Sequence, residues 1–286
     1  MAPEPKAAGR AASRAPERSG FYGKTLHRLL EEGVLRRDMS VLVVCGGEAD
    51  RDVFLGLGFE DVTISNLGGG SEEGVRPYRW AVEDAEQLSY GDESFDLVAV
   101  SGGLHHCRSP HRALLEMYRV ARQAVFVLES RDSLLMRTAV GLGVVDEYEL
   151  TAVAAHEFES GGVRDTSAPN YVYRWTEREV RKAIASNAPH AQHRILFFHE
   201  LELPFSVLGM RFGRPGELAA RIAEPALGLV TRLLPGQANL FAFCVLKPAL
   251  PRDLQPWMKL AEGEPVPDEE WIRGRLATTP EGADGG

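Results

Sequence analysis

The sequence contains few cysteines, no long apolar run and no excess of basic residues. Cys45, Cys107 and Cys244 lie far apart and form no CxxC pair, so neither a disulfide framework nor a cysteine metal site is expected. Such cysteine usage favours a reducing, cytoplasmic setting. No apolar stretch reaches the length of a membrane span. A formal net charge of −9 argues against capture of nucleic acid or of an anionic membrane surface.

The two ends of the chain differ in composition from its middle. Residues 1–20 are rich in Ala, Arg, Pro and Ser and lack the apolar core of a secretory signal, so we expect a disordered tail. Residues 251–286 are rich in Pro, Asp, Glu and Gly and are expected to be partly disordered, although Trp257 and Trp271 indicate that part of them packs. One domain is therefore expected over residues 21–250.

Within this domain, strand-like and helix-like segments alternate. The pattern from Tyr22 to Arg37 is amphipathic at helical spacing, although Gly33 weakens it. Ser109-Pro110 has the composition of a helix start, and Thr176 with Glu179 forms a capping-box pattern. Irregular or helical segments are expected over about 142–190 and 205–235. Strands are predicted near 41–45, 62–65, 79–82, 96–101, 124–129, 194–202 and 239–247.

Strands that are apolar throughout and separated by helices predict an α/β fold, with a mostly parallel sheet covered by helices on both faces. The two late segments are expected to add an antiparallel edge hairpin. Parallel sheets bind ligands beyond the carboxyl ends of their strands. In this sequence those ends fall at 45–47, 65–66, 101–106 and 129–132, and candidate site residues are sought there.

Three stretches together resemble the class I S-adenosylmethionine-dependent methyltransferases of the small-molecule type. They are "VLVVCGGEADR", "EDAEQLSYGDESFDLVAV" and "SGGLHHCRSPHRALLEMYRVARQAVFVLE", and they cover about residues 40–130. The resemblance implies a seven-stranded Rossmann-like sheet, S-adenosylmethionine as cofactor and a small methyl acceptor. The two late strands match the closing hairpin of this family more weakly.

The resemblance also implies positions for the cofactor. The first loop, Cys45-Gly46-Gly47, would wrap the methionine part, with Glu48 or Asp50 near its ammonium group because Val43 stands where the family has an acidic residue. The further cofactor-binding candidates are Asn66 and Leu67 at the ribose, Asp84 and Ala85 at the adenine, and Ser101 and Gly102 after the fourth strand.

Each of these positions also has a purely structural interpretation. Gly46 and Gly47 are also explained by a tight strand-to-helix turn, and Asn66 by the ordinary preference of Asn for turns. The acidic run at Asp84 would otherwise be interpreted as a solvated helix start. Asn66 replaces the usual carboxylate, but its amide can both accept and donate a hydrogen bond.

His105 and His106 follow the fourth strand and are the catalytic candidates. An imidazole suits the role of a general base when the methyl acceptor must lose a proton, whereas packing against the cofactor is the alternative role. Lesser candidates are His111, Glu129, Arg131, Asp132 and His156. No metal is expected, because His105, His106 and His111 lack a helical ligand spacing.

The alternation of Tyr171, Tyr173 and Trp175 fits either the roof of a substrate pocket or a short strand facing the core. A nicotinamide-dependent dehydrogenase should show the fuller G-x-G-x-x-G and an acidic residue after the second strand, and this chain shows neither. A methyltransferase-like scaffold without activity, serving as a binding or regulatory partner, is the second alternative. The expected activity is methyl transfer, most often to oxygen, on a specialised metabolite, a sugar or a lipid precursor, without nucleic acid or membrane as partner. The oligomeric state is left open.

Overall fold

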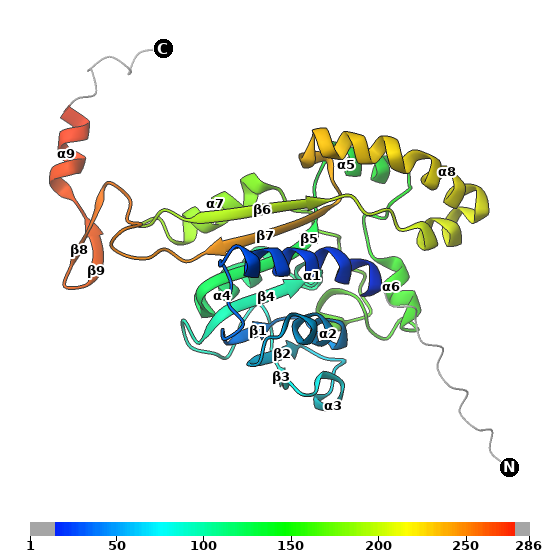
Figure 1. The fold of residues 1–286 in the computed structure, drawn as a ribbon, viewed down its shortest axis with the longest axis horizontal. Helices are drawn as coiled ribbons and strands as arrows, with labels where there is room; N and C mark the ends of the chain where they lie inside the picture. The colour runs from blue at the N-terminus through cyan, green and yellow to red at the C-terminus, as the bar shows by residue number, and fades with distance from the viewer. Residues whose placement is uncertain (1–14, 278–286) are drawn as a thin grey trace.

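A computed structural model describes residues 15–277, and the expectations for residues 1–14 and 278–286 lie outside this range. The centre of the molecule is a seven-stranded sheet with the order β3-β2-β1-β4-β5-β7-β6 (Figure 1). Strands β1 to β5 are parallel, and β7 is antiparallel to both β5 and β6. The predicted Rossmann-like sheet with its antiparallel edge is therefore confirmed.

The strands lie close to the predicted segments. Their bounds are β1 (Val41–Val43), β2 (Val62–Asn66), β3 (Arg79–Val82), β4 (Phe95–Ser101), β5 (Ala121–Ser130), β6 (Arg194–Glu200) and β7 (Leu240–Leu246). The central strands β1, β4, β5 and β7 are almost wholly buried, which explains why they are apolar throughout. β3 lies at one edge and is half exposed.

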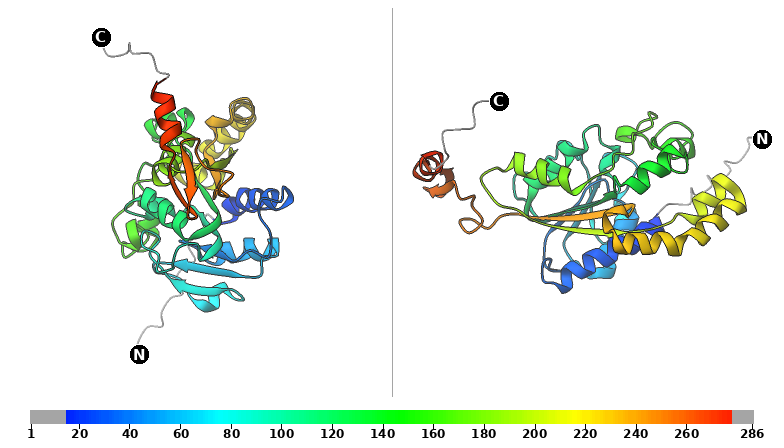
Figure 2. Two further views of the ribbon diagram at one scale, coloured as in Figure 1. Left: turned by 90° about the vertical axis from the view of Figure 1, so that its left-hand side faces the viewer. Right: turned by 90° about the horizontal axis from the view of Figure 1, so that it is seen from above.

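Helices cover both faces of the sheet (Figure 2). On one face, α1 (Ala15–Glu31) and α2 (Glu48–Leu57) pack over side chains such as Val41, Ile64 and Phe126. On the other face, α4 (Pro110–Val120) and α7 (Glu177–Asn187) pack over the alternate residues of the same strands, such as Leu42 and Val98. Successive side chains of a strand point to opposite faces, so one apolar run supplies both cores.

The helix ends follow the sequence signals. The side chain of Ser109 accepts a hydrogen bond from the backbone N–H of Arg112, with Pro110 in the first turn of α4. The predicted capping box of Thr176 and Glu179 begins α7. The first helix differs from the prediction: α1 begins at Ala15, inside the segment expected to be disordered, and ends at Glu31, ahead of Gly33 with its left-handed φ of +67°.

Four elements lie beyond the carboxyl end of β5 or between β6 and β7. They are α5 (Leu134–Gly141), α6 (Leu150–Ala155), the 3₁₀ turn η2 (Val163–Asp165) and the long helix α8 (Phe205–Leu233). α8 bends at Gly213, which has φ +69° and ψ −171° and precedes Pro215. Several apolar side chains of α8 are exposed, including those of Met210, Ile222 and Leu233.

The C-terminal segment forms a hairpin of β8 (Met258–Ala261) and β9 (Glu264–Pro267), followed by α9 (Glu269–Ala277). Figure 1 shows this unit projecting from the end of the sheet. The rings of Trp257 and Trp271 lie 6.1 Å apart, so the two tryptophans that suggested packing do contact one another. Among the helices of residues 15–277, none is long and apolar enough to cross a membrane. The short elements that remain are α3 (Glu72–Val75), η1 (Leu104–His106) and η3 (Pro235–Gln237).

Candidate active site

The loop after β1 is tightly built against β2 and β4. Cys45 adopts a left-handed φ of +52°, and a Cβ atom at Gly103 would lie 2.4 Å from the Cβ of Cys45. A Cβ at Gly46 would lie 2.8 Å from Cγ1 of Val43, so glycine is required there. Around Gly47, by contrast, the space is open: no heavy atom lies within 4 Å of a Cβ built there.

The residues that follow this loop differ in their surroundings. Gly47 is the N-cap of α2, and its N–H donates to Oδ2 of Asp50 over 2.9 Å. Burial raises the pKa of the Asp50 carboxyl to about 6, while the bond from Gly47 opposes that shift. Glu48 is exposed, and its carboxylate lies beside Gly74 of α3. Of the two carboxyls considered for the cofactor's ammonium group, Asp50 is thus the one next to the loop.

Asn66, at the end of β2, joins the first two loops. Its Nδ2 donates to the carbonyl oxygen of Gly46 over 3.2 Å, and its Oδ1 accepts from the N–H of Leu67 over 2.8 Å. An amide carries two donor hydrogens and two acceptor lone pairs, so one of each remains after these bonds. That remaining pair suits the two hydroxyls of a ribose, one accepting and one donating.

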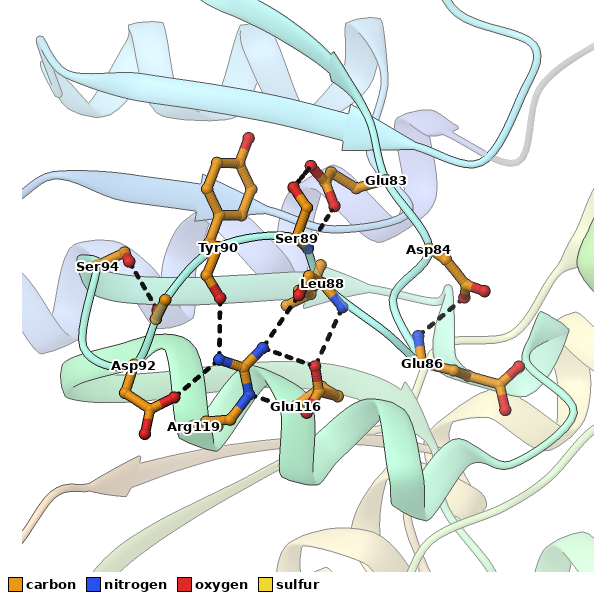
Figure 3. Close-up of polar contacts among 11 residues, drawn as sticks. Glu83, Asp84, Glu86, Leu88, Ser89, Tyr90, Asp92, Ser94, Glu116 and Arg119 are labelled. Atoms are coloured by element: carbon orange, nitrogen blue, oxygen red, sulfur yellow. Dashed lines mark hydrogen bonds and ion pairs between the residues drawn. The ribbon is translucent and has the colours of Figure 1, made fainter.

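The loop after β3 is held from below by α4 (Figure 3). The guanidinium of Arg119 donates to the carbonyl oxygens of Leu88 and Tyr90 and pairs with Asp92 and Glu116. Glu116 in turn accepts the N–H of Leu88 over 3.1 Å. A single arginine therefore fixes the course of the loop by hydrogen bonds to backbone and carboxylate groups.

At the start of the same loop, Asp84 and Glu86 are arranged differently. Asp84 Oδ1 accepts the N–H of Glu86 over 3.0 Å, as Figure 3 also shows, and its Oδ2 lies 2.7 Å from Nη1 of Arg164. Glu86 is buried and accepts the N–H groups of Arg108 and Ser109, each over 3.0 Å. Ala85 points into the core. Asp84 is thus a carboxylate that is 26% exposed, beyond the carboxyl end of β3, and it does not lie at the start of a helix.

β4 ends at Ser101 and leads into the histidine pair. Gly102 has φ +63°, and its N–H donates to the carbonyl oxygen of Leu128 over 2.7 Å, which turns the chain toward β5. His105 and His106 lie in η1 with their ring centres 4.5 Å apart. His105 is 2% exposed, whereas the side chain of His106 is 34% exposed.

Two glutamates face these histidines. Nδ1 of His105 lies 2.7 Å from Oε2 of Glu129 at the end of β5, and Oε1 of Glu129 accepts the N–H of Leu104. Oε2 of Glu149 lies 3.6 Å from Nε2 of His105 and 3.3 Å from Nε2 of His106. The two histidines therefore share one carboxylate, and His105 has a second carboxylate to itself.

The two imidazoles consequently titrate in opposite directions. Burial opposes the protonation of His105, but the charges and hydrogen bonds of Glu129 and Glu149 outweigh it and raise its pKa to about 9. Burial, followed by repulsion from His105, lowers the pKa of His106 despite Glu149. At neutral pH, His105 is a cation fixed between two carboxylates, and His106 is a neutral imidazole.

Comparison with known proteins adds a family to this geometry. Residues 65–128 match the family model described as a methyltransferase domain, which spans the second and third loops and the histidine pair. The seven-stranded sheet, with the antiparallel β7 between β5 and β6, matches the Rossmann-like fold that the resemblance implies. The matched stretch therefore belongs to a methyltransferase domain. Its cofactor is S-adenosylmethionine, and the protein is an enzyme of the S-adenosylmethionine-dependent methyltransferase type.

Solved structures similar to this methyltransferase share little sequence with it. A candidate methyltransferase of Bacillus halodurans C-125 is 17% identical, with a TM-score of 0.49, and covers 79% of this chain and 100% of its own. The YcgJ protein of Bacillus subtilis is 14% identical, with a TM-score of 0.45, over 81% of this chain and 98% of its own. Magnesium protoporphyrin IX methyltransferase of Synechocystis PCC 6803, solved with bound S-adenosylhomocysteine, is 10% identical, with a TM-score of 0.46, over 80% and 83%. No curated protein matches the chain.

The cofactor candidates of the methyltransferase lie on three neighbouring loops at one edge of the sheet. Because β1, β2 and β4 are adjacent and parallel, their carboxyl ends bring the loops at 45–48, 66–67 and 101–102 together, and the loop at 84–85 follows β3 beside them. Three features suit S-adenosylmethionine: the open space at Gly47, the unused donor and acceptor of Asn66, and the partly exposed carboxylate of Asp84.

Sequence reasoning missed two site residues of the methyltransferase and ranked a third too low. Glu149 and Arg164 lie in a segment expected to be irregular, and no local pattern marks them. Glu129 was among the lesser candidates. Its place at the end of the apolar strand β5, next to β4, could have indicated that it lies near the histidines that follow β4. Of the other lesser candidates, His111 packs against Tyr173 and Trp175, and His156 is exposed and bonds to Ala152.

The histidine pair and Glu149 could also coordinate a cation. One ligand atom from each of His105, His106 and Glu149 lies within 4.8 Å of the others, and this is the group of that kind found among residues 15–277. His111 does not belong to it. The methyltransferase needs no such ion to explain the contacts, because each histidine already faces a glutamate carboxylate. The absence of a metal stays a prediction.

Proposed function

We propose that this methyltransferase transfers the methyl group to an oxygen atom of a small molecule, in the class of specialised metabolites, sugars and lipid precursors. The observation that carries the proposal is His106. It is a neutral, one-third exposed imidazole directly after β4, at the edge of the sheet where the cofactor loops meet. A neutral imidazole can take the proton that a hydroxyl must lose as it is methylated.

The bound cofactor supplies an electrophilic methyl group. The residues of this chain align the acceptor, exclude water and accept the proton at His106. His105 acts as a positioning residue, because its ring is fixed by Glu129 and packs against that of His106. Glu149 stabilises the cation that forms on His106 after proton transfer, since its Oε2 lies 3.3 Å from Nε2.

The cofactor would be held by the loops described above. Gly46 and Gly47 allow backbone to approach the methionine part, Asn66 meets the ribose and Asp84 accepts the adenine amine. The supporting positions are Cys45, Glu48, Leu67, Ala85, Ser101 and Gly102. We assign the reaction to the cytoplasm on the cysteine usage, with no nucleic acid and no membrane as partner.

Calorimetry with S-adenosylhomocysteine, S-adenosylmethionine and NAD tests the cofactor. We expect saturable binding of both sulfur compounds and none of NAD. Asp84→Ala should weaken binding by about 1–3 kcal/mol, because the adenine amine loses its acceptor. Binding of NAD alone would favour a dehydrogenase. Binding of none of the three would favour an inactive scaffold.

Mass spectrometry with a panel of hydroxylated metabolites, sugars and lipids tests the reaction by a mass gain of one CH₂ unit. With an acceptor found, His106→Gln should lower kcat about 10²- to 10⁴-fold while cofactor affinity is unchanged. The matched control is His156→Gln, which changes an exposed histidine outside the site. Because the pKa of His106 lies below the usual value, the wild-type rate should stay level through neutral pH and fall only in acid. A variant that keeps its turnover would leave His106 as a packing residue.

A further inference from the structure

A large cavity lies beside the proposed site and has no role in cofactor binding. Its volume is about 580 Å³, within the range of small-molecule sites. It is lined by α5, by the segment leading into α6 and by α8, where the chain passes between β6 and β7. Apolar side chains supply most of its wall, including Leu135, Met136, Val145, Leu208, Phe212 and Leu227.

One end of this cavity reaches Glu149, the carboxylate that the two histidines share. Glu149 belongs to the cavity wall and also lies 3.3 Å from Nε2 of His106. Ser130, at the carboxyl end of β5, lines the cavity as well. A molecule in the cavity can therefore place one end beside the carboxylate that His106 contacts, while the rest of it lies along α8.

Arg174 gives the cavity a positive charge. Its Nη2 donates to the carbonyl oxygen of Asp146 over 2.8 Å and its Nη1 to that of Val172 over 3.4 Å, while its buried Nε has no hydrogen-bond partner. Among the residues that the structure describes, no carboxylate lies within 4.0 Å of this guanidinium. Burial lowers the pKa of Arg174, although the more distant charges of Asp132, Glu147 and Glu149 oppose this shift.

The other charged groups of the wall are already matched. Asp146 pairs with Arg211 over 2.7 Å, and Glu149 faces the two histidines. Glu202, the third carboxylate of the wall, has an interaction partner too. The charge that lacks a close counter-ion is therefore positive, and an anionic group of a ligand would satisfy both it and the free Nε–H.

We propose that this cavity binds the methyl acceptor, and that the acceptor is a hydroxylated amphiphile with one hydrocarbon chain and one acidic group. The chain lies against α8, the acidic group faces Arg174 and the hydroxyl faces His106. This inference rests on the proposed function and narrows its substrate class to acidic lipids. A carboxylate and a phosphate monoester share the chemistry that Arg174 recognises.

Calorimetry on the full chain saturated with S-adenosylhomocysteine provides the test. The probes are hexanoate, dodecanoate, dodecyl phosphate and the uncharged dodecyl maltoside. We expect dodecanoate or dodecyl phosphate to bind. The probe that binds more tightly identifies whether the natural ligand carries a carboxylate or a phosphate. Hexanoate should bind more weakly, by about fourfold for each methylene no longer buried, and dodecyl maltoside at least tenfold more weakly.

Two pairs of variants assign the binding to the cavity. Ala223 lines the cavity, whereas Ala226 is exposed on the same helix, so Ala223→Trp should abolish probe binding and Ala226→Trp should not. Arg174→Gln should lower the affinity for dodecanoate and dodecyl phosphate at least tenfold, so that they no longer bind more tightly than dodecyl maltoside. Arg174→Lys should restore part of that preference, and Arg178→Gln, at an exposed arginine of α7, should have no effect.

The outcomes separate this inference from the proposed function. If S-adenosylhomocysteine binds and none of the amphiphiles does, the cavity proposal is wrong and the methyltransferase remains. Equal affinity for charged and uncharged probes, or unchanged affinity in Arg174→Gln or Ala223→Trp, also overturns it. If S-adenosylhomocysteine itself fails to bind, the failure lies with the proposed function.

Discussion

The ion pair of His105 and Glu129 should make the fold less stable at alkaline pH than at neutral pH. The side chains of both residues are almost fully buried, at 1% and 0% exposure. The pKa of His105 is raised from 6.5 to about 9 in the folded protein, so the folded state holds this proton more tightly than the unfolded chain does. The resulting stabilisation is complete below pH 6.5 and is lost as the pH rises through about 9.

The magnitude follows from the size of the shift. One pKa unit corresponds to about 1.4 kcal/mol, so His105 should contribute about 3 kcal/mol to the free energy of unfolding at pH 6 and almost nothing at about pH 9.5. His105→Gln removes the titrating group. The variant should be less stable than the wild type at pH 6. Between pH 6 and 9.5, only the wild type should lose the about 3 kcal/mol of unfolding free energy that His105 contributes.

Urea unfolding followed by tryptophan fluorescence measures both proteins across this range. All other ionisable groups are the same in the wild type and in His105→Gln, so the difference between the two stability curves isolates His105. His156→Gln should retain the wild-type pH dependence, because that histidine is exposed. If wild type and His105→Gln lose stability in parallel from pH 6 to 9.5, His105 is not the protonated partner of Glu129.

Three further predictions concern the first loop and the possible cation. Gly46→Ala should lower the free energy of unfolding by about 1–3 kcal/mol, because its Cβ would overlap Val43. Gly47→Ala adds a Cβ in open space, so it should lower the free energy of unfolding by less than about 1 kcal/mol. Its main effect should be weaker binding of S-adenosylhomocysteine, measured by calorimetry. Asp50→Asn should raise the free energy of unfolding by about 1–3 kcal/mol at pH 8 and have no such effect at pH 4. The reason is that a carboxyl with a pKa raised to about 6 destabilises the fold only when it is ionised. Equal effects in urea titrations at both pH values would contradict this. EDTA should leave methyl transfer unchanged, and a loss restored by added zinc would identify His105, His106 and Glu149 as a metal centre.

The sheet could be predicted from the sequence because its signal is local. Each central strand is a short apolar run, and burial on both faces leaves such a run little other choice. The end of α1 was harder, since the helical pattern continues past Gly33 while the backbone there turns left-handed. Such an interruption depends on how the next strand must enter the sheet, which periodicity does not record.

The geometry of the candidate site was predictable only where a residue follows a strand. Asn66, Asp84 and His105 lie at strand ends, and parallel pairing brings such ends to one edge whatever the loops do. Glu149, Arg164 and Arg174 come from the segment between β5 and α7, and tertiary packing alone brings them to the same edge. The charge of a residue in such a segment says nothing of its partner until the fold is known.

The insertion of β7 between β5 and β6 has a consequence for how the chain folds. β7 begins about 110 residues after β5 ends, yet all seven of its residues pair with β5. At a synthesis rate of about 5–20 residues per second, the apolar edge of β5 remains open for on the order of ten seconds before its neighbour exists. An unpaired apolar strand edge is a template for wrong association. The half of the sheet that carries the candidate cofactor loops can form early, but it stays exposed to aggregation until residue 246 has been made.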